Sequence, residues 1–131
     1  MGIQATEVTH GIRISVETKF QSEHSVAEHR HFLFSYRITI ENKSDFTVQL
    51  ISRHWDIYDS SSDHSEVDGE GVVGEQPVLE PGEVFEYESA CSLTTDIGKM
   101  KGTYLMERKI DKARFYVNIP EFELIVPQRL N

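Results

Sequence analysis

Hydrophobic and polar residues alternate along most of the chain, which is the pattern of β-strands with one buried and one exposed face. Between residues 12 and 20, for example, Ile12, Ile14 and Val16 alternate with charged and polar side chains. No window keeps a helical period. The pattern predicts roughly eight strands separated by turn residues, and therefore an all-β fold, an antiparallel two-sheet sandwich. The clearest predicted strands cover residues 12–20, 32–40, 48–58, 84–91, 100–106, 115–119 and 122–126.

Turn residues divide these strands. The segment 42–45, the serine run at 60–63, the Pro81-Gly82 pair and the charged tip at 108–112 all predict turns, and Pro120 predicts an interruption. In the strand over 48–58, alternation places five residues on one side, namely Gln49, Ile51, Arg53, Trp55 and Ile57. The arginine and tryptophan of that set could form a cation–π shelf for a ligand. The favoured interpretation is structural, with the tryptophan in the core and the arginine covering its edge.

Length and charge narrow the class of protein. The 131 residues predict a single domain over 1–131, and the net charge of −9 argues against general nucleic-acid binding. No apolar run is long enough for membrane insertion, and one cysteine, Cys91, leaves no internal disulfide, so we expect a cytoplasmic protein. The charge is uneven: residues 54–98 hold twelve acidic residues and no Lys or Arg.

A glycine motif lies inside this acidic segment. Gly69, Gly71 and Gly74 match G-x-G-x-x-G, the loop that brings a backbone close to a pyrophosphate at the start of a helix. Pro77 and Pro81 follow too soon for that helix, and the negative field would repel a polyphosphate unless a metal ion bridged them. The alternative is structural, because glycines between strands mark bulges, tight bends or close backbone approaches.

Metal ligands are available in two places. The acidic segment offers Asp63, Glu66, Asp68 and Glu70 for weak binding of hydrated Mg²⁺ or Ca²⁺, with a solvated acidic surface as the alternative. His29 and His31, two residues apart on a predicted strand, would point to the same side and could bind a transition metal ion. The sequence indicates no required cofactor. It contains no recognisable catalytic constellation either, so we expect the protein not to be an enzyme.

Taken together, several strings resemble the ApaG family across nearly the whole chain. They are residues 48–50 with Arg53 and Trp55, 67–77, 79–83, 87–89, 98–104 and 119–122. The resemblance implies an immunoglobulin- or fibronectin-III-like β-sandwich. It also implies a small cytoplasmic protein associated with cobalt resistance and magnesium efflux, without accepted catalytic residues. Similar domains form one part of an F-box protein and of a DNA-polymerase-interacting protein, where they look like protein-interaction modules.

Three functions follow in order of preference. The first is a non-enzymatic module that binds an as yet unknown protein partner, as the resemblance implies. The second is metal-bridged binding of pyrophosphate or a nucleotide at Gly69, Gly71 and Gly74. The third is direct binding of a divalent metal ion, Co²⁺ or Mg²⁺, by the histidine pair or the acidic segment, with Co²⁺ suggested by the resemblance.

Overall fold

The predicted alternation forms long antiparallel strands in a computed structural model, which describes residues 4–26, 29, 31–60 and 63–127. The strands are β1 (Gln4–Thr9), β2 (Ile12–Phe20), β3 (Phe32–Asn42), β4 (Val48–Asp59), β5 (His64–Glu70), β6 (Val78–Leu79), β7 (Val84–Leu93), β8 (Ile97–Arg108) and β9 (Arg114–Ile125). A 3-10 turn, η1 (Ser22–His24), follows β2. Within these described residues no helix is long and apolar enough to cross a membrane.

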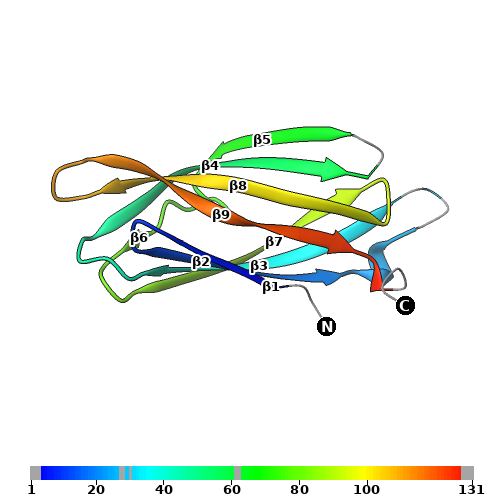
Figure 1. Ribbon diagram of the computed structural model, residues 1–131, viewed down its shortest axis with the longest axis horizontal. Helices are drawn as coiled ribbons and strands as arrows, with labels where there is room; N and C mark the ends of the chain where they lie inside the picture. The colour runs from blue at the N-terminus through cyan, green and yellow to red at the C-terminus, as the bar shows by residue number, and fades with distance from the viewer. Residues whose placement is uncertain (1–3, 27–28, 30, 61–62, 128–131) are drawn as a thin grey trace.

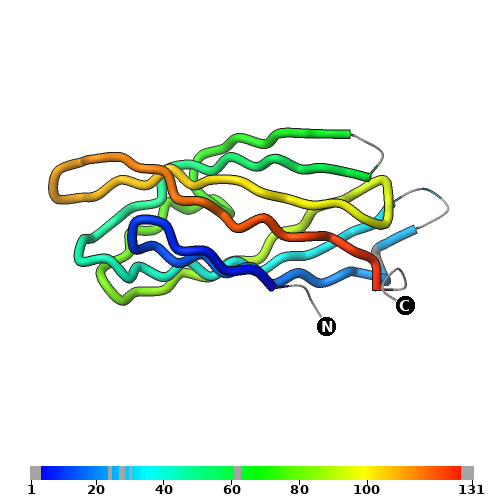
Figure 2. The backbone as a smooth tube through the Cα atoms, viewed as in Figure 1, coloured from blue at the N-terminus to red at the C-terminus, as the bar shows by residue number. Residues whose placement is uncertain are grey.

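The strands form two antiparallel sheets that face each other, which confirms the predicted sandwich (Figures 1 and 2). One sheet has the order β1-β2-β3-β7, and the other has the order β5-β4-β8-β9, with the short β6 paired to β4. On one side the sheets meet where β1 runs beside β9. There Asn118 donates hydrogen bonds from its main chain to Thr9 Oγ1 at 3.2 Å and from its side chain to Glu7 Oε2 at 3.1 Å. On the other side, β5 and β7 are edge strands.

The core fills the space between the sheets with the inward residues of both. Trp55 is 3 % exposed and makes edge contacts with the rings of Tyr36 and Phe122, at centroid distances of 5.5 and 5.9 Å. The structural interpretation of this tryptophan is therefore confirmed. Beside it, the hydroxyl groups of Tyr87 and Tyr104 hydrogen-bond to each other at 2.5 Å, so two polar atoms in the core satisfy each other.

Two bulges change the predicted faces. The pairing of β4 with β8 shifts between Leu50 and Ser52, so one extra residue reverses the alternation. Leu50 points into the core before the shift and Trp55 after it, and the prediction that Gln49 and Ile51 share the tryptophan's side is wrong. The second bulge is in β9, where the register shifts opposite the step from Met100 to Gly102 and the strand continues through Pro120. The predicted interruption there is a bulge.

Three strands were not predicted from the alternation: β1, β5 and the two-residue β6. β1 and β5 lie at sheet edges, and both lack a run of fully buried side chains. Residues 63–70 of the acidic segment, for which no strand was predicted, are mainly the strand β5, which is paired with β4 along its whole length. This pairing brings acidic residues of β5 beside histidine and aspartate residues of β4, and it positions the site described next.

Candidate functional site on the outer face of β4 and β5

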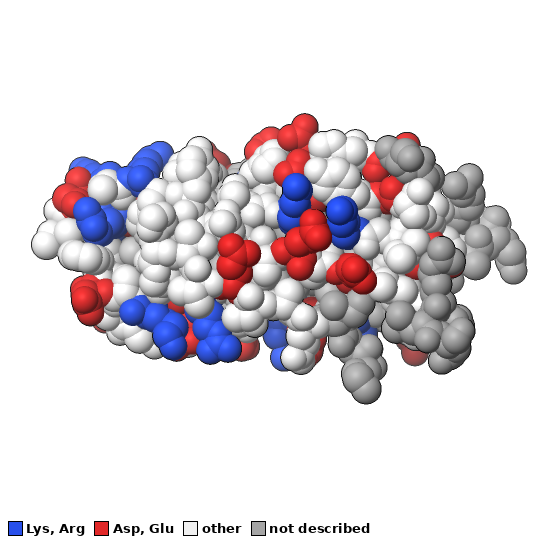
Figure 3. Space-filling view, in the orientation of Figure 1, with Lys and Arg blue, Asp and Glu red and all other residues white. Residues whose placement is uncertain are grey.

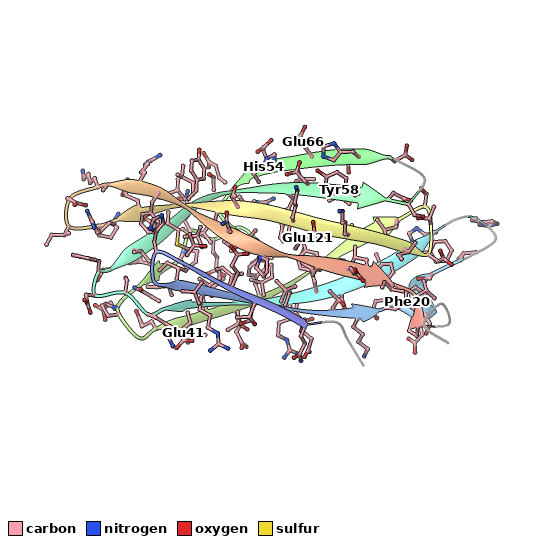
Figure 4. All side chains as sticks on the ribbon, viewed as in Figure 1. Phe20, Glu41, His54, Tyr58, Glu66 and Glu121 are labelled. Carbon is pink, nitrogen blue, oxygen red and sulfur yellow. The ribbon has the colours of Figure 1, made fainter. Side chains whose placement is uncertain are left out.

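The register between β4 and β5 places ionisable side chains in cross-strand pairs. The three pairs are His54 with Asp68, Asp56 with Glu66, and Tyr58 with His64. Since Trp55 points into the core and side chains alternate along a strand, these six side chains share the outer face of the sheet. Figure 4 shows His54 and Glu66 close together over β4 and β5, with Tyr58 further along β4.

His54 lies at the centre of this group. Its Nδ1 is 2.7 Å from an oxygen of Asp68, and its Nε2 is 3.3 Å from Asp56 Oδ2 and 3.5 Å from Glu66 Oε1. The hydrogen bond with Asp68 raises the pKa of His54, although desolvation opposes it in part. His64 contacts the other side of Asp56, with its Nε2 3.0 Å from Oδ1, and this hydrogen bond is the main reason that the pKa of Asp56 is lowered.

Potential metal ligands therefore converge at one point. One ligand atom each from His54, Asp56 and Glu66 lies within 4.8 Å of the others, and in the described part of the chain this is the one group of three or more such residues. Of the predicted ligands, Glu66 belongs to the group, and Asp68 supports it through His54. The sequence interpretation did not name His54 or Asp56. Their spacing of two residues on a predicted strand places both side chains on the same face, and this pattern could have identified them.

The other predicted ligands lie elsewhere. Asp63 stands at the turn before β5, where its main-chain oxygen accepts a hydrogen bond from Asp59 N at 2.9 Å. The prediction that His29 and His31 share a strand is wrong, because β3 begins at Phe32. The His31 ring instead lies 3.0 Å, at Nδ1, from the hydroxyl of Ser92 on β7.

Hollows lie on both sides of His54 on this face. One, of about 310 Å³, is bordered by Lys101 and Thr103 of β8 and by Asn118 and Glu121 of β9. Its floor is Gly102, where a Cβ atom would lie 2.1 Å from the main-chain oxygen of His54. The other hollow, of about 350 Å³, lies towards Arg53 and Tyr116 and is bordered by Asp68 of β5 and Thr103 of β8.

Lysine and aromatic side chains continue the same face beyond the histidine cluster. The Tyr58 ring stacks on the His64 ring at a centroid distance of 4.5 Å, and the ammonium groups of Lys99 and Lys101 lie 5.4 and 5.6 Å from the centre of the Tyr58 ring. Lys99 also pairs with Glu121 at 3.6 Å. Acidic side chains line the upper edge over β5 in Figure 3, whereas Lys and Arg side chains gather at the left end, near the hairpin between β8 and β9.

The glycine motif forms a tight turn at the end of β5. Val72 and Glu75 exchange two main-chain hydrogen bonds, of 2.8 and 2.9 Å, and the turn between them has positive φ angles at Val73 and Gly74. Gly71 also has a positive φ of 59°, and a Cβ atom there would lie 2.1 Å from the oxygen of Glu75. The motif is followed by the short strand β6 rather than by a helix.

Arg53 holds this turn from the inner side. Its Nη1 donates hydrogen bonds to the main-chain oxygens of Glu70 and Gly71, at 3.1 and 2.9 Å, and its guanidinium occupies the space where a Cβ atom of Gly69 would lie. The Gly71 N–H is already bonded to the oxygen of Ile51 at 2.9 Å. These contacts explain on structural grounds why glycines occupy these positions. Pyrophosphate binding by the motif stays a prediction.

The sequence of this chain is similar to proteins of one known family. The family model described as the ApaG domain matches residues 22–108. The chain is 48 % identical to Protein ApaG of Anaeromyxobacter dehalogenans over 127 residues, which are 97 % of this chain and 99 % of that protein. It is 47 % identical to Protein ApaG of Brucella canis over 122 residues, 93 % of each chain.

Solved structures agree with the sequence comparison. The crystal structure of the putative ApaA protein from Bordetella pertussis superposes with a TM-score of 0.86 and 39 % identity, covering 96 % of this chain and 98 % of that one. The C-terminal domain of wzt superposes with a TM-score of 0.56 at 7 % identity, covering 94 % of this chain and 77 % of that one, a likeness of fold alone.

Proposed function

This chain belongs to the ApaG domain family, and we propose that it is a non-enzymatic protein-binding module whose edge strand β5 pairs with an extended, Lys- and Arg-rich segment of a protein partner. The observation that carries the proposal is the exposure of β5. Of its seven residues, six are exposed, on both faces of the strand. An edge strand with solvent on both faces is a template for adding a further strand.

The main chain of β5 offers hydrogen-bonding groups at this edge. Asp63 O and Gly71 N both bond to β4, and antiparallel pairing engages every second residue. Ser65, Val67 and Gly69 lie at even spacings from these two residues, so their main-chain N–H and C=O groups also point towards β4. Glu66 and Asp68 lie between these and direct their N–H and C=O groups away from β4, where an added strand would bind them.

The side chains of β5 determine which partner strand can bind beside it. Glu66, Asp68 and Glu70 are exposed and negative, and within the described residues no Lys or Arg side chain forms an ion pair with any of them. On the inner side, Val67 is 40 % exposed. Cross-strand partners of opposite charge are favourable and like charges are not. A strand that alternates basic and small apolar residues complements both faces.

The negative charge also acts against unwanted pairing. A second copy of the same edge would place its carboxylates beside these, so the charge disfavours edge-to-edge association of the protein with itself. A basic segment gains from the same field, because it approaches a part of the chain that has twelve acidic residues and no Lys or Arg between residues 54 and 98. Binding should therefore weaken as salt is added.

The experiment measures binding of a fluorescein-labelled peptide in which Lys and Val alternate. Replacing Glu66, Asp68 and Glu70 by Lys should weaken binding about tenfold, because it removes three exposed ion pairs of about 0.2–1 kcal/mol each and about 1.4 kcal/mol corresponds to a factor of ten. The matched control carries the same change of charge at Asp45, Glu80 and Glu123, which are exposed and lie on other parts of the surface.

A second peptide separates strand pairing from simple charge attraction. The same Lys-Val sequence with alternate amides N-methylated keeps its charge and loses hydrogen bonds on one edge, so it should bind less tightly than the unmodified peptide. Equal affinity for the two peptides, or equal loss of affinity in the β5 variant and in its control, would overturn the proposal.

A further inference from the structure

We infer that His54, Asp56 and Glu66 bind a divalent transition-metal ion, of which Zn²⁺ is the representative, on the outer face of β4 and β5. This inference goes beyond the proposed function and does not rest on it. The three residues supply one imidazole nitrogen and two carboxylate oxygens, and water would complete the coordination. His54 and Asp56 stand on β4, which has strands on both sides, and Glu66 is directly opposite Asp56 on β5.

The distances suit a small ion. Zn–N and Zn–O bonds are about 2.0–2.2 Å long, so two ligand atoms of a tetrahedral site lie about 3.3–3.6 Å apart. His54 Nε2 is 3.3 Å from Asp56 Oδ2 and 3.5 Å from Glu66 Oε1. Little movement is therefore needed for these three atoms to face a common ion. The side chains of His54 and Asp56 are 32 % and 21 % exposed, which leaves a path for the ion from solvent.

The neighbours of these ligands orient them for metal binding. A metal-bound histidine usually donates its other ring N–H to a carboxylate, which fixes the tautomer. Asp68 is placed to accept that bond from Nδ1 of His54 at 2.7 Å, so the Nε2 lone pair faces Asp56 and Glu66. His64 contacts Oδ1 of Asp56 and leaves Oδ2 directed at the proposed ion.

The local charge favours a cation. Asp56, Glu66 and Asp68 bring three carboxylates to the cluster. Glu7 of β1 and Glu121 of β9 border the adjacent hollow and add negative charge. Lys101 of β8 borders the same hollow, but its ammonium group lies 5.6 Å from the centre of the Tyr58 ring and forms no ion pair with Asp56 in the described structure. The imidazole ligand favours Zn²⁺ over Mg²⁺, which prefers oxygen ligands and retains its water.

The test is calorimetric titration of the full chain with Zn²⁺, together with ¹⁵N spectra of the histidine rings. We expect one site of defined affinity and a shift at Nε2 of His54. His54→Ala and Glu66→Gln should each weaken binding at least tenfold, and Glu66→Gln keeps the shape of the side chain. Asp68→Asn should weaken it by a factor of about ten, within the range found for neighbours of metal ligands.

The matched control is the double variant His29→Ala, His31→Ala, which removes two imidazoles elsewhere on the surface and should bind Zn²⁺ as the wild type does. The inference is overturned if His54→Ala binds with unchanged affinity, or if affinity falls only in the His29, His31 variant. Peptide binding by β5 is a separate measurement, and His54→Ala retains all three acidic residues on which it depends, so the two proposals can fail independently.

Discussion

Replacing Gly71 by Ala tests whether the glycine motif is a structural turn. Gly71 has a φ of 59°, and an added Cβ atom would lie 2.1 Å from the main-chain oxygen of Glu75. That oxygen accepts the 2.8 Å hydrogen bond from Val72, a residue that is fully buried. The substitution therefore has to move main-chain atoms that close the turn.

The expected loss of stability has two parts. An L-residue in the left-handed region costs about 1–2 kcal/mol. Displacing the Glu75 carbonyl weakens a hydrogen bond whose net contribution is about 0.5–1.5 kcal/mol. The gain from a less flexible unfolded chain, about 0.4–1 kcal/mol, offsets some of this. We expect Gly71→Ala to lower the free energy of unfolding by about 2 kcal/mol.

Gly74→Ala is the matched control in the same motif. Its φ is also positive, at 81°, but no atom lies within 4 Å of an added Cβ, so it should lose only about 1 kcal/mol, the conformational part. Urea unfolding can be followed through the fluorescence of the single tryptophan, Trp55, which is buried in the core. Equal losses in the two variants would refute the reasoning, because the close approach to Glu75 would then have no energetic effect.

Three further predictions concern the core and the hairpin between β8 and β9. Tyr87→Phe should lower the free energy of unfolding by about 1–3 kcal/mol, because the hydroxyl of Tyr104 is left buried without its partner. The double variant with Tyr104→Phe should lose less stability than the two single variants lose together. Burial raises the pKa of Cys91 to about 11, so at pH 8 its reaction with a thiol reagent should be much slower in the folded protein than in urea, and equal rates would contradict this. Arg108 lowers the pKa of Asp111 to about 2, below its usual 3.8. The ion pair should therefore stabilise the hairpin above pH 4, and this stabilisation should disappear as the pH falls towards 2. An NMR titration of the Asp111 carboxyl group with a midpoint near 3.8 would contradict this prediction.

The strands that contribute to the core were predictable from the sequence. In β2 the buried residues Ile12, Ile14 and Val16 alternate with exposed or half-buried ones, and the strand begins and ends where predicted. The edge strand β5 was not predictable in this way, because a strand exposed on both faces shows no alternation of burial. Its sequence of alternating acidic and small residues resembles a polar loop until its pairing with β4 is known.

The candidate site depended on that same pairing. Glu66 and Asp68 were identified as possible ligands because acidic residues are conspicuous in the sequence. His54 and Asp56 stand more than nine residues away in the chain and reach them only through the antiparallel register. The prediction for His29 and His31 failed for the opposite reason, because residues close in sequence need not share a strand.

Hydrogen exchange at single amides of β5 tests the proposed strand pairing most directly. Without a partner, the N–H groups of Glu66 and Asp68 face solvent and should exchange quickly, whereas those of Val67 and Gly69 face β4 and should exchange slowly. Adding the Lys-Val peptide should slow exchange at Glu66 and Asp68 to a rate similar to that of their neighbours. Unchanged exchange at these two amides in the presence of saturating peptide would contradict strand addition at β5.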